Sequence, residues 1–374
     1  MKRFIFDQLV DAENICNLTK EKKALGSYIT NKERVVIYAP RNFGKTSLLK
    51  NVVIPQFKKE NNPSFTFFTD LMEVKDMPSL VARLKNSFEH SFADSFPVKN
   101  IFENIKQFLF GLKPDITIDP VTSQAGISLK IVPNSKEYSI DYIFRLIKNI
   151  ADKVPVVVVI DEFQDIVNVD ESQAMFRKAF EELGDVPIIV MGSQRHILSN
   201  IFSKPNAPLA FWGNDLPIES IDYGEYHEYI QERFDKRNLK IDVNCSKYLQ
   251  DILWRIPEPI NIVCHQIFNT YENEEIKIEQ VNVTIRNLLE NKKSRYESYL
   301  AGFSSAEERV CVNLAKIDSI QKPQSKDFVS ACQVTSRTVG KVFNKFQDRG
   351  IIEKMDFGYR LTDPLLNYYL NIFR

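Results

Sequence analysis

A lysine–threonine pair occupies a predicted turn between a strand and a helix. Residues 39–46, APRNFGKT, follow the apolar run at residues 35–38 and precede a helical run. They match the phosphate-binding pattern GxxxxGK[ST] at every position but the first, where Ala39 replaces glycine. In such a loop, backbone N–H groups and the positive end of the helix dipole face a phosphate. The alternative is a chance occurrence of these residue types at a turn.

The loop predicts a site for ATP with Mg²⁺. We expect the Lys45 ammonium to reach the β- and γ-phosphates and the Thr46 hydroxyl to ligate Mg²⁺. Gly44 would let the backbone approach the phosphates closely. The predicted nucleotide-binding residues of this loop are Ala39, Pro40, Arg41, Asn42, Phe43, Gly44, Lys45, Thr46 and Ser47.

Two adjacent carboxylates follow the longest β-branched run of the chain. Residues 156–160 show no polar alternation, which predicts a strand buried on both faces of a parallel sheet. The carboxyl ends of such strands lie beside the phosphate loop. We expect Asp161 to hold Mg²⁺ through water and Glu162 to polarise the attacking water. The alternative is that both acids cap the helix that follows.

The next apolar strand, at residues 188–191, also ends in polar residues. We expect Ser193 to contact the γ-phosphate or orient the water, and Arg195 to stabilise charge in the same or a neighbouring chain. The alternative is a helix cap at Ser193 with a solvated Arg195. The predicted catalytic residues are therefore Glu162, Lys45, Ser193 and Arg195, and the predicted metal ligands are Thr46 and Asp161.

The elements around these motifs predict an α/β protein with a parallel-sheet core. Strands alternate with helices up to about Pro217, where the strands stop, and residues 115–131 predict a β-hairpin or insertion. Four helices follow, then a polar, basic connector at residues 291–295. The remaining elements follow the order typical of a winged helix: helices at 306–317, 326–332 and 336–349, strands at 351–354 and 359–361, and a helix from 363. The predicted domains are residues 1–222, 223–298 and 299–374.

The third of these helices carries a basic stripe. Spacing of i, i+4 places its cationic side chains on one face, where they could contact the phosphates of double-stranded DNA. The alternative is a solvated face of a domain that binds protein. The predicted nucleic-acid contacts are Arg337, Lys341, Lys345 and Arg349.

Composition excludes several classes of protein. Of the 374 residues, 44% are hydrophobic, which is enough for a sizeable core and argues against disorder. Lysine plus arginine equals aspartate plus glutamate at 49 each, so the chain as a whole is not a polyanion binder. No apolar run is long enough for a membrane span, and no secretory signal is evident. The five scattered cysteines lack CxxC spacing, so we expect buried, reduced thiols in a cytoplasmic protein.

Taken together, these motifs resemble those of the archaeal-type P-loop ATPases of the STAND branch of the AAA+ superfamily, relatives of the origin-recognition initiators. The resemblance rests on the segments APRNFGKTSLL, VVVVIDEFQDI, VMGSQRHIL, WRIPEPINIV and YRLTDPLLNYYL. It implies an AAA+-like P-loop core, a helical lid and a C-terminal winged helix. It also implies that a lid proline, here Pro257, contacts adenine. Ala39 and Arg255 depart from the family pattern, which has glycine at both positions.

We therefore expect a Mg²⁺-dependent ATPase, slow or partner-stimulated, that acts as a switch. Its winged helix would engage DNA, a protein partner or another copy of the chain. One alternative is a nucleotide-gated DNA-binding regulator that does not hydrolyse ATP. Another is a protein-interaction module with no role in nucleic-acid binding.

Overall fold

The chain divides into two compact units. The computed structural model describes residues 2–16, 18–96, 115–118, 125–128, 140–355 and 357–374. The core unit comprises Leu18–Pro40 and Lys45–Glu219, and the helical unit comprises Met1–Asn17, Arg41–Gly44 and Ser220–Arg374. The first seventeen residues thus belong with the later part of the chain. The three predicted domain boundaries stay a prediction.

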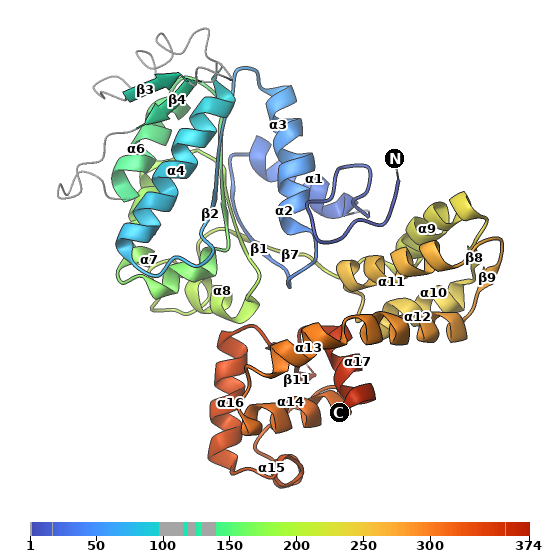
Figure 1. Cartoon of the computed structure of the whole chain (residues 1–374). Helices are drawn as coiled ribbons and strands as arrows, with labels where there is room; N and C mark the ends of the chain where they lie inside the picture. The colour runs from blue at the N-terminus through green and yellow to red at the C-terminus, as the bar shows by residue number, and fades with distance from the viewer. Residues whose placement is uncertain (1, 17, 97–114, 119–124, 129–139, 356) are drawn as a thin grey trace. The chain divides into compact units, whose positions relative to one another are not determined.

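A five-stranded parallel sheet forms the centre of the core unit (Figure 1). Its order is β2-β5-β6-β1-β7, so β6 lies between β1 and β5. The strands are β1 (Arg34–Tyr38), β2 (Phe65–Asp70), β5 (Val156–Asp161), β6 (Ile188–Gly192) and β7 (Asn214–Pro217). Every residue of β5 and β6 is buried, which confirms the predicted two-sided burial.

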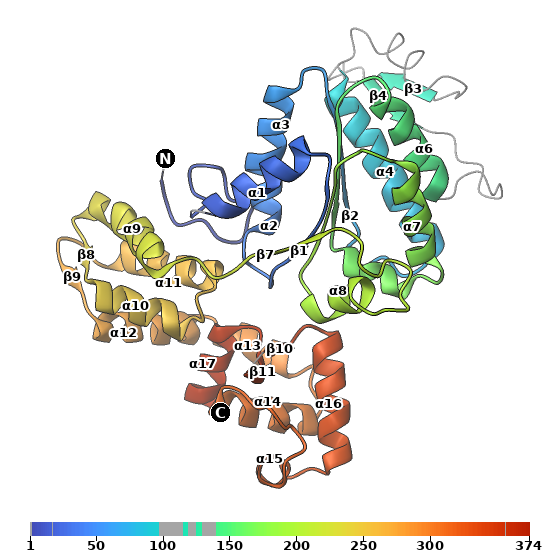
Figure 2. The same cartoon turned by 180° about the vertical axis from the view of Figure 1, so that it is seen from behind.

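Helices cover both faces of this sheet (Figures 1 and 2). One layer contains α1 (Thr19–Thr30), α2 (Lys45–Leu48) and α3 (Ile54–Glu60). The other contains α4 (Met77–Ser95), α6 (Ile140–Ala151) and α7 (Ser172–Glu182), and α8 (Arg195–Phe202) follows β6. Phe67, Phe144 and Phe180 belong to the fully buried aromatic core between the sheet and the second layer.

The helix after the phosphate loop is not regular. A π-helical turn, Leu49–Val53, joins α2 to α3. Pro55 lies in the first turn of α3 and has no N–H to donate, so a regular α-helical bond to residue 51 cannot form there.

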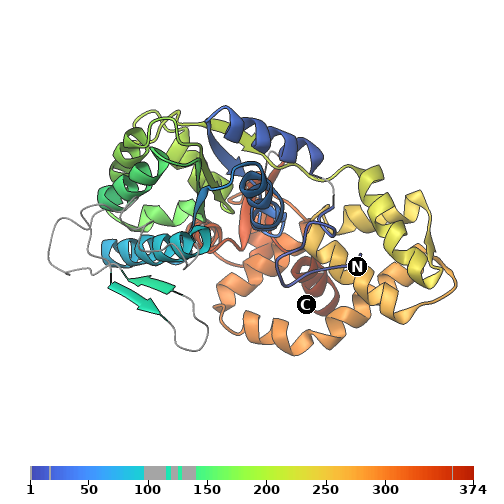
Figure 3. The same cartoon turned by 90° about the horizontal axis from the view of Figure 1, so that it is seen from above.

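The predicted insertion contains a hairpin. Strands β3 (Asp115–Ile118) and β4 (Ala125–Ser128) pair antiparallel, which confirms the β-hairpin at these residues. Figure 3 shows the pair alongside α4. Residues 119–124 and 129–131 of the prediction lie outside the described residues.

Four helices form the first part of the helical unit. They are α9 (Tyr223–Phe234), α10 (Val243–Ile252), α11 (Pro257–Thr270) and α12 (Ile278–Asn291). The prediction that strands stop at Pro217 was wrong, because β8 (Lys240–Ile241) and β9 (Glu275–Ile276) form a short parallel pair. Two-residue strands leave too little periodicity to detect in a sequence. The predicted connector was also largely wrong, since α13 (Lys293–Leu300) begins within it.

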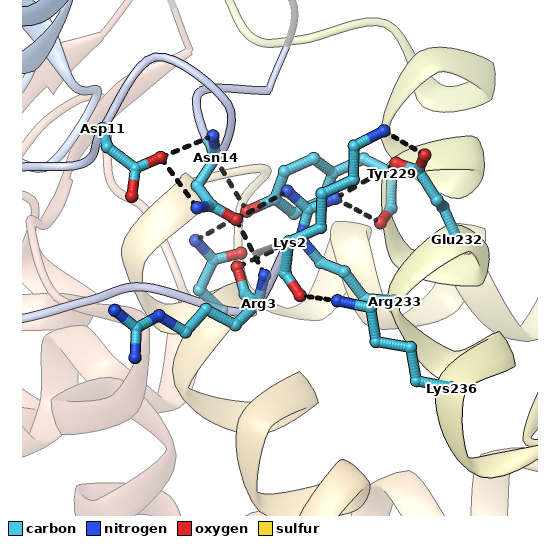
Figure 4. Close-up of polar contacts among 9 residues, drawn as sticks. Lys2, Arg3, Asp11, Asn14, Tyr229, Glu232, Arg233 and Lys236 are labelled. Atoms are coloured by element: carbon cyan, nitrogen blue, oxygen red, sulfur yellow. Dashed lines mark hydrogen bonds and ion pairs between the residues drawn. The ribbon is translucent and has the colours of Figure 1, made fainter.

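The N-terminal segment packs on α9 through a buried arginine of that helix (Figure 4) and on α11 through Asn261, which donates to Ile5 O. The Arg233 side chain is 2% exposed and donates to Arg3 O, Tyr229 O and Asn14 Oδ1 at 3.1, 3.0 and 3.2 Å. Its guanidinium lies 3.3 Å from the centroid of the Tyr229 ring, and the Tyr229 hydroxyl donates to Asn14 O. Phe4 packs edge-on against the same tyrosine. We call these five residues the arginine clasp.

The C-terminal elements follow the predicted order. They are α14 (Ser305–Ile317), α15 (Lys326–Cys332), α16 (Ser336–Asp348), β10 (Ile352–Met355), β11 (Gly358–Leu361) and α17 (Pro364–Phe373). Ser304 and Glu307 begin α14 with a reciprocal capping box. All five cysteines are free, and Cys16 alone among them is not fully buried. Across the residues that the structure describes, no helix has the length and apolar character of a membrane span.

Candidate functional site

The phosphate loop has the backbone that its glycine demands. Gly44 has a φ of 78° and Asn42 a φ of 66°, both in the left-handed region. Ala39 is not left-handed, so alanine in place of the first glycine of the pattern causes no backbone strain. The loop joins the carboxyl end of β1 to α2, as the sequence predicts.

Lys45, the first residue of α2, has a buried ammonium group. The side chain is 6% exposed, and its Nζ donates to the carbonyl oxygens of Ala39 and Pro40 at 3.1 Å each. These neutral partners hold the lysine over its own loop. A buried cation bound by dipoles is well placed to exchange them for an anionic phosphate.

Thr46 and Asp161, the two predicted metal ligands, lie in contact with each other. The Thr46 Oγ1 hydroxyl donates to Asp161 Oδ2 at 2.7 Å, although β6 separates β5, which ends at Asp161, from β1, which precedes the loop to α2. Asp161 is 3% exposed, and its Oδ1 accepts the backbone N–H of Glu162. Burial raises the pKa of Asp161 to about 6, against the lowering effects of Thr46 and Lys45. The carboxylate is therefore short of the positive charge that a cation would supply.

Glu162 has a strained backbone and a side chain held from two directions. Its φ of 50° places it in the left-handed region, which is rare for residues with a side chain. Its Oε2 accepts from Gln164 Nε2 at 2.5 Å and from Ser193 Oγ at 2.8 Å. Glu162 makes no side-chain cap to the helical turn Phe163–Asn168, so the capping alternative does not describe it.

Ser193 and Arg195 diverge after β6. Ser193 is buried and bonds Glu162, and the residue that precedes α8 is Gln194, which makes no side-chain cap. Arg195 is exposed at the start of α8. Its charge opposes the rise that burial causes in the pKa of Tyr38, so it lies near the end of β1. The structure thus joins Ser193 to Glu162 and leaves Arg195 apart from that contact.

Two polar residues near this site were missed in the sequence. Gln164 follows Glu162 by two residues and is 2% exposed, and its bond to Glu162 could have been suspected only from that spacing. Asp70 ends β2 opposite Asp161 in the sheet register, and its charge further raises the pKa of Asp161. A polar residue at the end of a buried strand was the available signal for Asp70.

The helical unit holds the predicted adenine contact. Pro257 is the first residue of α11, and its carbonyl accepts the Tyr226 hydroxyl at 3.0 Å. Arg255 has a φ of 58°, which explains why glycine would suit this position. Its side chain lies over the Tyr223 ring and donates to the carbonyl of Ile221. The replacement of glycine thus adds contacts within this unit.

The basic residues of α16 do not share one environment. Arg337, Lys341, Lys345 and Arg349 are all exposed. Lys345 forms an ion pair with Glu307, the buried acid of the α14 capping box. Its hydrogen bond is the main cause that lowers the pKa of Glu307. Lys345 therefore already has a structural partner, whereas no ion pair of the other three occurs among the described residues.

The residues of the core unit fit a nucleotide with Mg²⁺. A threonine hydroxyl and a carboxylate supply the hard oxygen ligands that Mg²⁺ takes. A bound cation would favour the ionised form of Asp161, whose pKa is raised by burial. A bound phosphate would place negative charge beside the buried ammonium of Lys45. No separate cluster of three or more acids, histidines or cysteines that could hold a metal is found in the described ranges.

Similar proteins were found by structure and not by sequence. No known family profile matches the chain, and no curated protein matches it significantly. A Walker-type ATPase of Pyrococcus abyssi is similar over 99% of both chains, with a TM-score of 0.65 and 15% identity. The Aeropyrum pernix ORC2 protein, solved as ADPNP–ADP complexes, covers 99% of this chain and 97% of its own at a TM-score of 0.56 and 12% identity. The Aeropyrum pernix ORC1 protein in complex with DNA is similar over 98% of this chain and 95% of its own, with a TM-score of 0.52 and 11% identity.

These likenesses establish the fold. The chain has the α/β core with a five-stranded parallel sheet of the AAA+ P-loop NTPases, which confirms the predicted fold class. At such low identity they do not carry over an activity.

Proposed function

We propose that this protein binds ATP with Mg²⁺ and hydrolyses it slowly, as a nucleotide-dependent switch of the STAND/AAA+ kind. The observation that carries the proposal is the 2.7 Å contact of Thr46 with Asp161, beside the buried Lys45 and the Glu162 carboxylate. Loop and strand end thus come together as ATP hydrolysis requires. The similarity to a Walker-type ATPase and to the ORC2 protein with ADPNP and ADP supports it.

The residues divide the work in this proposal. The loop N–H groups and Lys45 bind the phosphates, and Thr46 and Asp161 hold Mg²⁺. Bound Mg²⁺ would neutralise phosphate charge. Glu162 accepts the proton of the attacking water, Ser193 fixes Glu162, and Arg195 remains a proposed charge stabiliser. Pro257 is the proposed adenine contact.

Turnover by the purified protein tests this function. Lys45→Ala should lose most nucleotide binding, and Glu162→Gln should retain binding while turnover falls about 10²–10⁴-fold, the usual contribution of a general base. Lys50→Ala, an exposed lysine on the same helical segment, is the matched control. Nucleotide binding without turnover by the wild type, with or without duplex DNA, would instead support the non-catalytic regulator.

We further propose that the C-terminal elements form a winged helix that engages DNA. The exposed Arg337, Lys341 and Arg349 on α16 support this proposal, and the similar ORC1 protein was solved with DNA. Binding through phosphates should weaken steeply as salt rises. Partner-protein binding that survives neutralisation of this face would favour the protein-interaction alternative. Free cysteines agree with the proposed cytoplasmic location.

A further inference from the structure

Two donors from different elements bind the same oxygen of Glu162. The Gln164 amide and the Ser193 hydroxyl both donate to Oε2, at 2.5 and 2.8 Å. The backbone N–H of Ser193 lies 3.4 Å from the same atom. Among the residues described, no hydrogen bond reaches Glu162 Oε1. The two oxygens of one carboxylate are therefore unequal, with Oε2 held and Oε1 available.

The Gln164 side chain is itself fixed. It is 2% exposed, and its Nε2 also donates to Asp165 Oδ1 at 3.2 Å. Its Oε1 lies so close to Gly192 that a Cβ on that glycine would stand 2.1 Å away. Gly192 at the end of β6 leaves room for the amide in this position. Burial and the bond to Asp165 hold the Gln164 amide beside Glu162.

The polar character of Gln164 is not explained by packing. Its buried Oε1 has no hydrogen-bond partner in the described part of the chain. An unpaired buried acceptor costs about 1–3 kcal/mol, a cost that an apolar side chain of similar length would avoid. The amide is accounted for by its bond to Glu162. The left-handed backbone of Glu162 adds strain of the kind that a surrounding network must maintain.

We propose that Gln164 is a positioning residue that, with Ser193, holds Glu162 Oε2 and thereby presents Oε1 to the attacking water. As the water oxygen bonds to the γ-phosphorus, its proton passes to Oε1 and the bond from that phosphorus to the ADP oxygen breaks. Gln164 touches neither water nor phosphate. This inference rests on the proposed ATP hydrolysis and goes beyond it by assigning how the base is oriented.

The first test compares steady-state kinetics of wild type, Gln164→Met and Gln173→Met. Methionine keeps the length of the side chain and removes both polar atoms. Gln173 on α7 also buries an unpaired amide oxygen but lies outside the site, so it controls for the loss of a buried amide. Gln164→Met should lower kcat about 10–100-fold with KM within twofold, because misorientation of a reacting group has effects of this order. Gln173→Met should leave both unchanged.

The second test removes the base itself. In a Glu162→Gln background, adding Gln164→Met should produce no further fall in kcat, because the residue acts only through Glu162. A full additional loss would overturn the inference. Thermal unfolding of each variant separates misfolding from misorientation.

A third variant reports the hydrogen bond directly. In Gln164→Glu the introduced carboxyl can donate to Glu162 only when protonated, so its kcat relative to wild type should rise as the pH falls from 8 to 6. A ratio that does not change with pH, or a wild-type kcat retained by Gln164→Met, would overturn the positioning role while hydrolysis stands. Absence of turnover by the wild type would overturn the proposed function, and this inference with it.

Discussion

The core unit and the helical unit each bury a charged side chain, and they treat the charge differently. In the arginine clasp, three oxygen acceptors and an aromatic face surround Arg233. Asp161 is equally buried, but among the described residues its carboxylate accepts only the Thr46 hydroxyl and the Glu162 N–H, and burial raises its pKa to about 6. The first charge is satisfied by the fold. The second is left to be satisfied by a ligand, and this difference separates a structural charge from a functional one.

The largest expected effect on stability comes from removing the buried charge of Arg233. Arg233→Met would remove the guanidinium that donates to Arg3 O, Tyr229 O and Asn14 Oδ1 in a buried place, although Asn14 Oδ1 would keep the backbone N–H of Arg3. We expect the free energy of unfolding to fall by about 3 kcal/mol, since each unpaired buried acceptor costs about 1–3 kcal/mol and water recovers part of this. Urea denaturation measures it.

The control for the arginine clasp is Arg286→Met on α12, whose side chain is 66% exposed. It should change the unfolding free energy by less than about 0.5 kcal/mol. Equal effects of the two substitutions would show that burial of the Arg233 charge is not what stabilises the N-terminal segment.

Removing the buried charge of Asp161 should raise the free energy of unfolding, whereas removing that of Arg233 lowers it. Without nucleotide or Mg²⁺, Asp161→Asn should stabilise the protein by about 1–2 kcal/mol at pH 8, because the cost of burying an ionised carboxylate is removed. The same variant should lose Mg²⁺-dependent turnover. Urea denaturation and an ATPase assay on one preparation give both values.

The pH dependence of that gain has a definite direction. The folded pKa of Asp161, about 6, lies above its ordinary value of 3.8, so the folded state binds more protons than the unfolded state between these values. Wild-type stability therefore falls as the pH rises through this window. The advantage of Asp161→Asn should be smaller at pH 5 than at pH 8. A constant difference would contradict burial as the cause.

The smallest expected effects are those of two lysines on α16, one of which should affect stability and the other DNA affinity. Lys345→Gln removes the cation paired with the buried Glu307 and should lower the unfolding free energy by about 1 kcal/mol at pH 7. The lowered pKa of Glu307 means that this stabilisation is lost as the pH falls, so wild type and variant should converge in acid. Lys341→Gln should leave stability unchanged and reduce the salt slope of DNA affinity by about one.

The matched control for DNA binding is Lys316→Gln, an exposed lysine at the end of α14. Equal losses of DNA affinity from Lys316→Gln and Lys341→Gln would remove α16 as the specific contact. Equal losses of stability from Lys341→Gln and Lys345→Gln would contradict the assignment of Lys345 to the fold.

The sequence predicted most of what depends on local pattern. Continuous apolar runs predicted β5 and β6, and the position of GKT after an apolar strand predicted the helix that begins at Lys45. The boundaries of α15 were matched because Phe328 and Cys332 give it an apolar face at helical spacing. The short β8 and β9, in contrast, pair residues that are far apart in sequence and carry no pattern of their own.

Side-chain orientation could not be predicted. The spacing of Glu162 and Gln164 gives no hint that Ser193 also donates to Glu162, since that contact depends on the insertion of β6 beside β5. Lys345 and Lys341 are equivalent on a helical wheel, and only the packing of α14 against α16 separates them. The position of Arg195 outside the Glu162 contact likewise follows from the course of the chain after β6.

The arginine clasp has a consequence for how such a chain could be recombined. Residues 2–16 belong to the helical unit, the chain then builds the core unit apart from the short loop Arg41–Gly44, and it returns to the helical unit at Ser220. A single genetic crossover cannot therefore exchange one unit cleanly. A hybrid gene joined only near residue 220 would pair a foreign N-terminal segment with this Arg233, and its guanidinium would be buried without the Asn14 side chain that accepts from it. Two junctions, near residues 17 and 220, are needed to transplant the core unit intact.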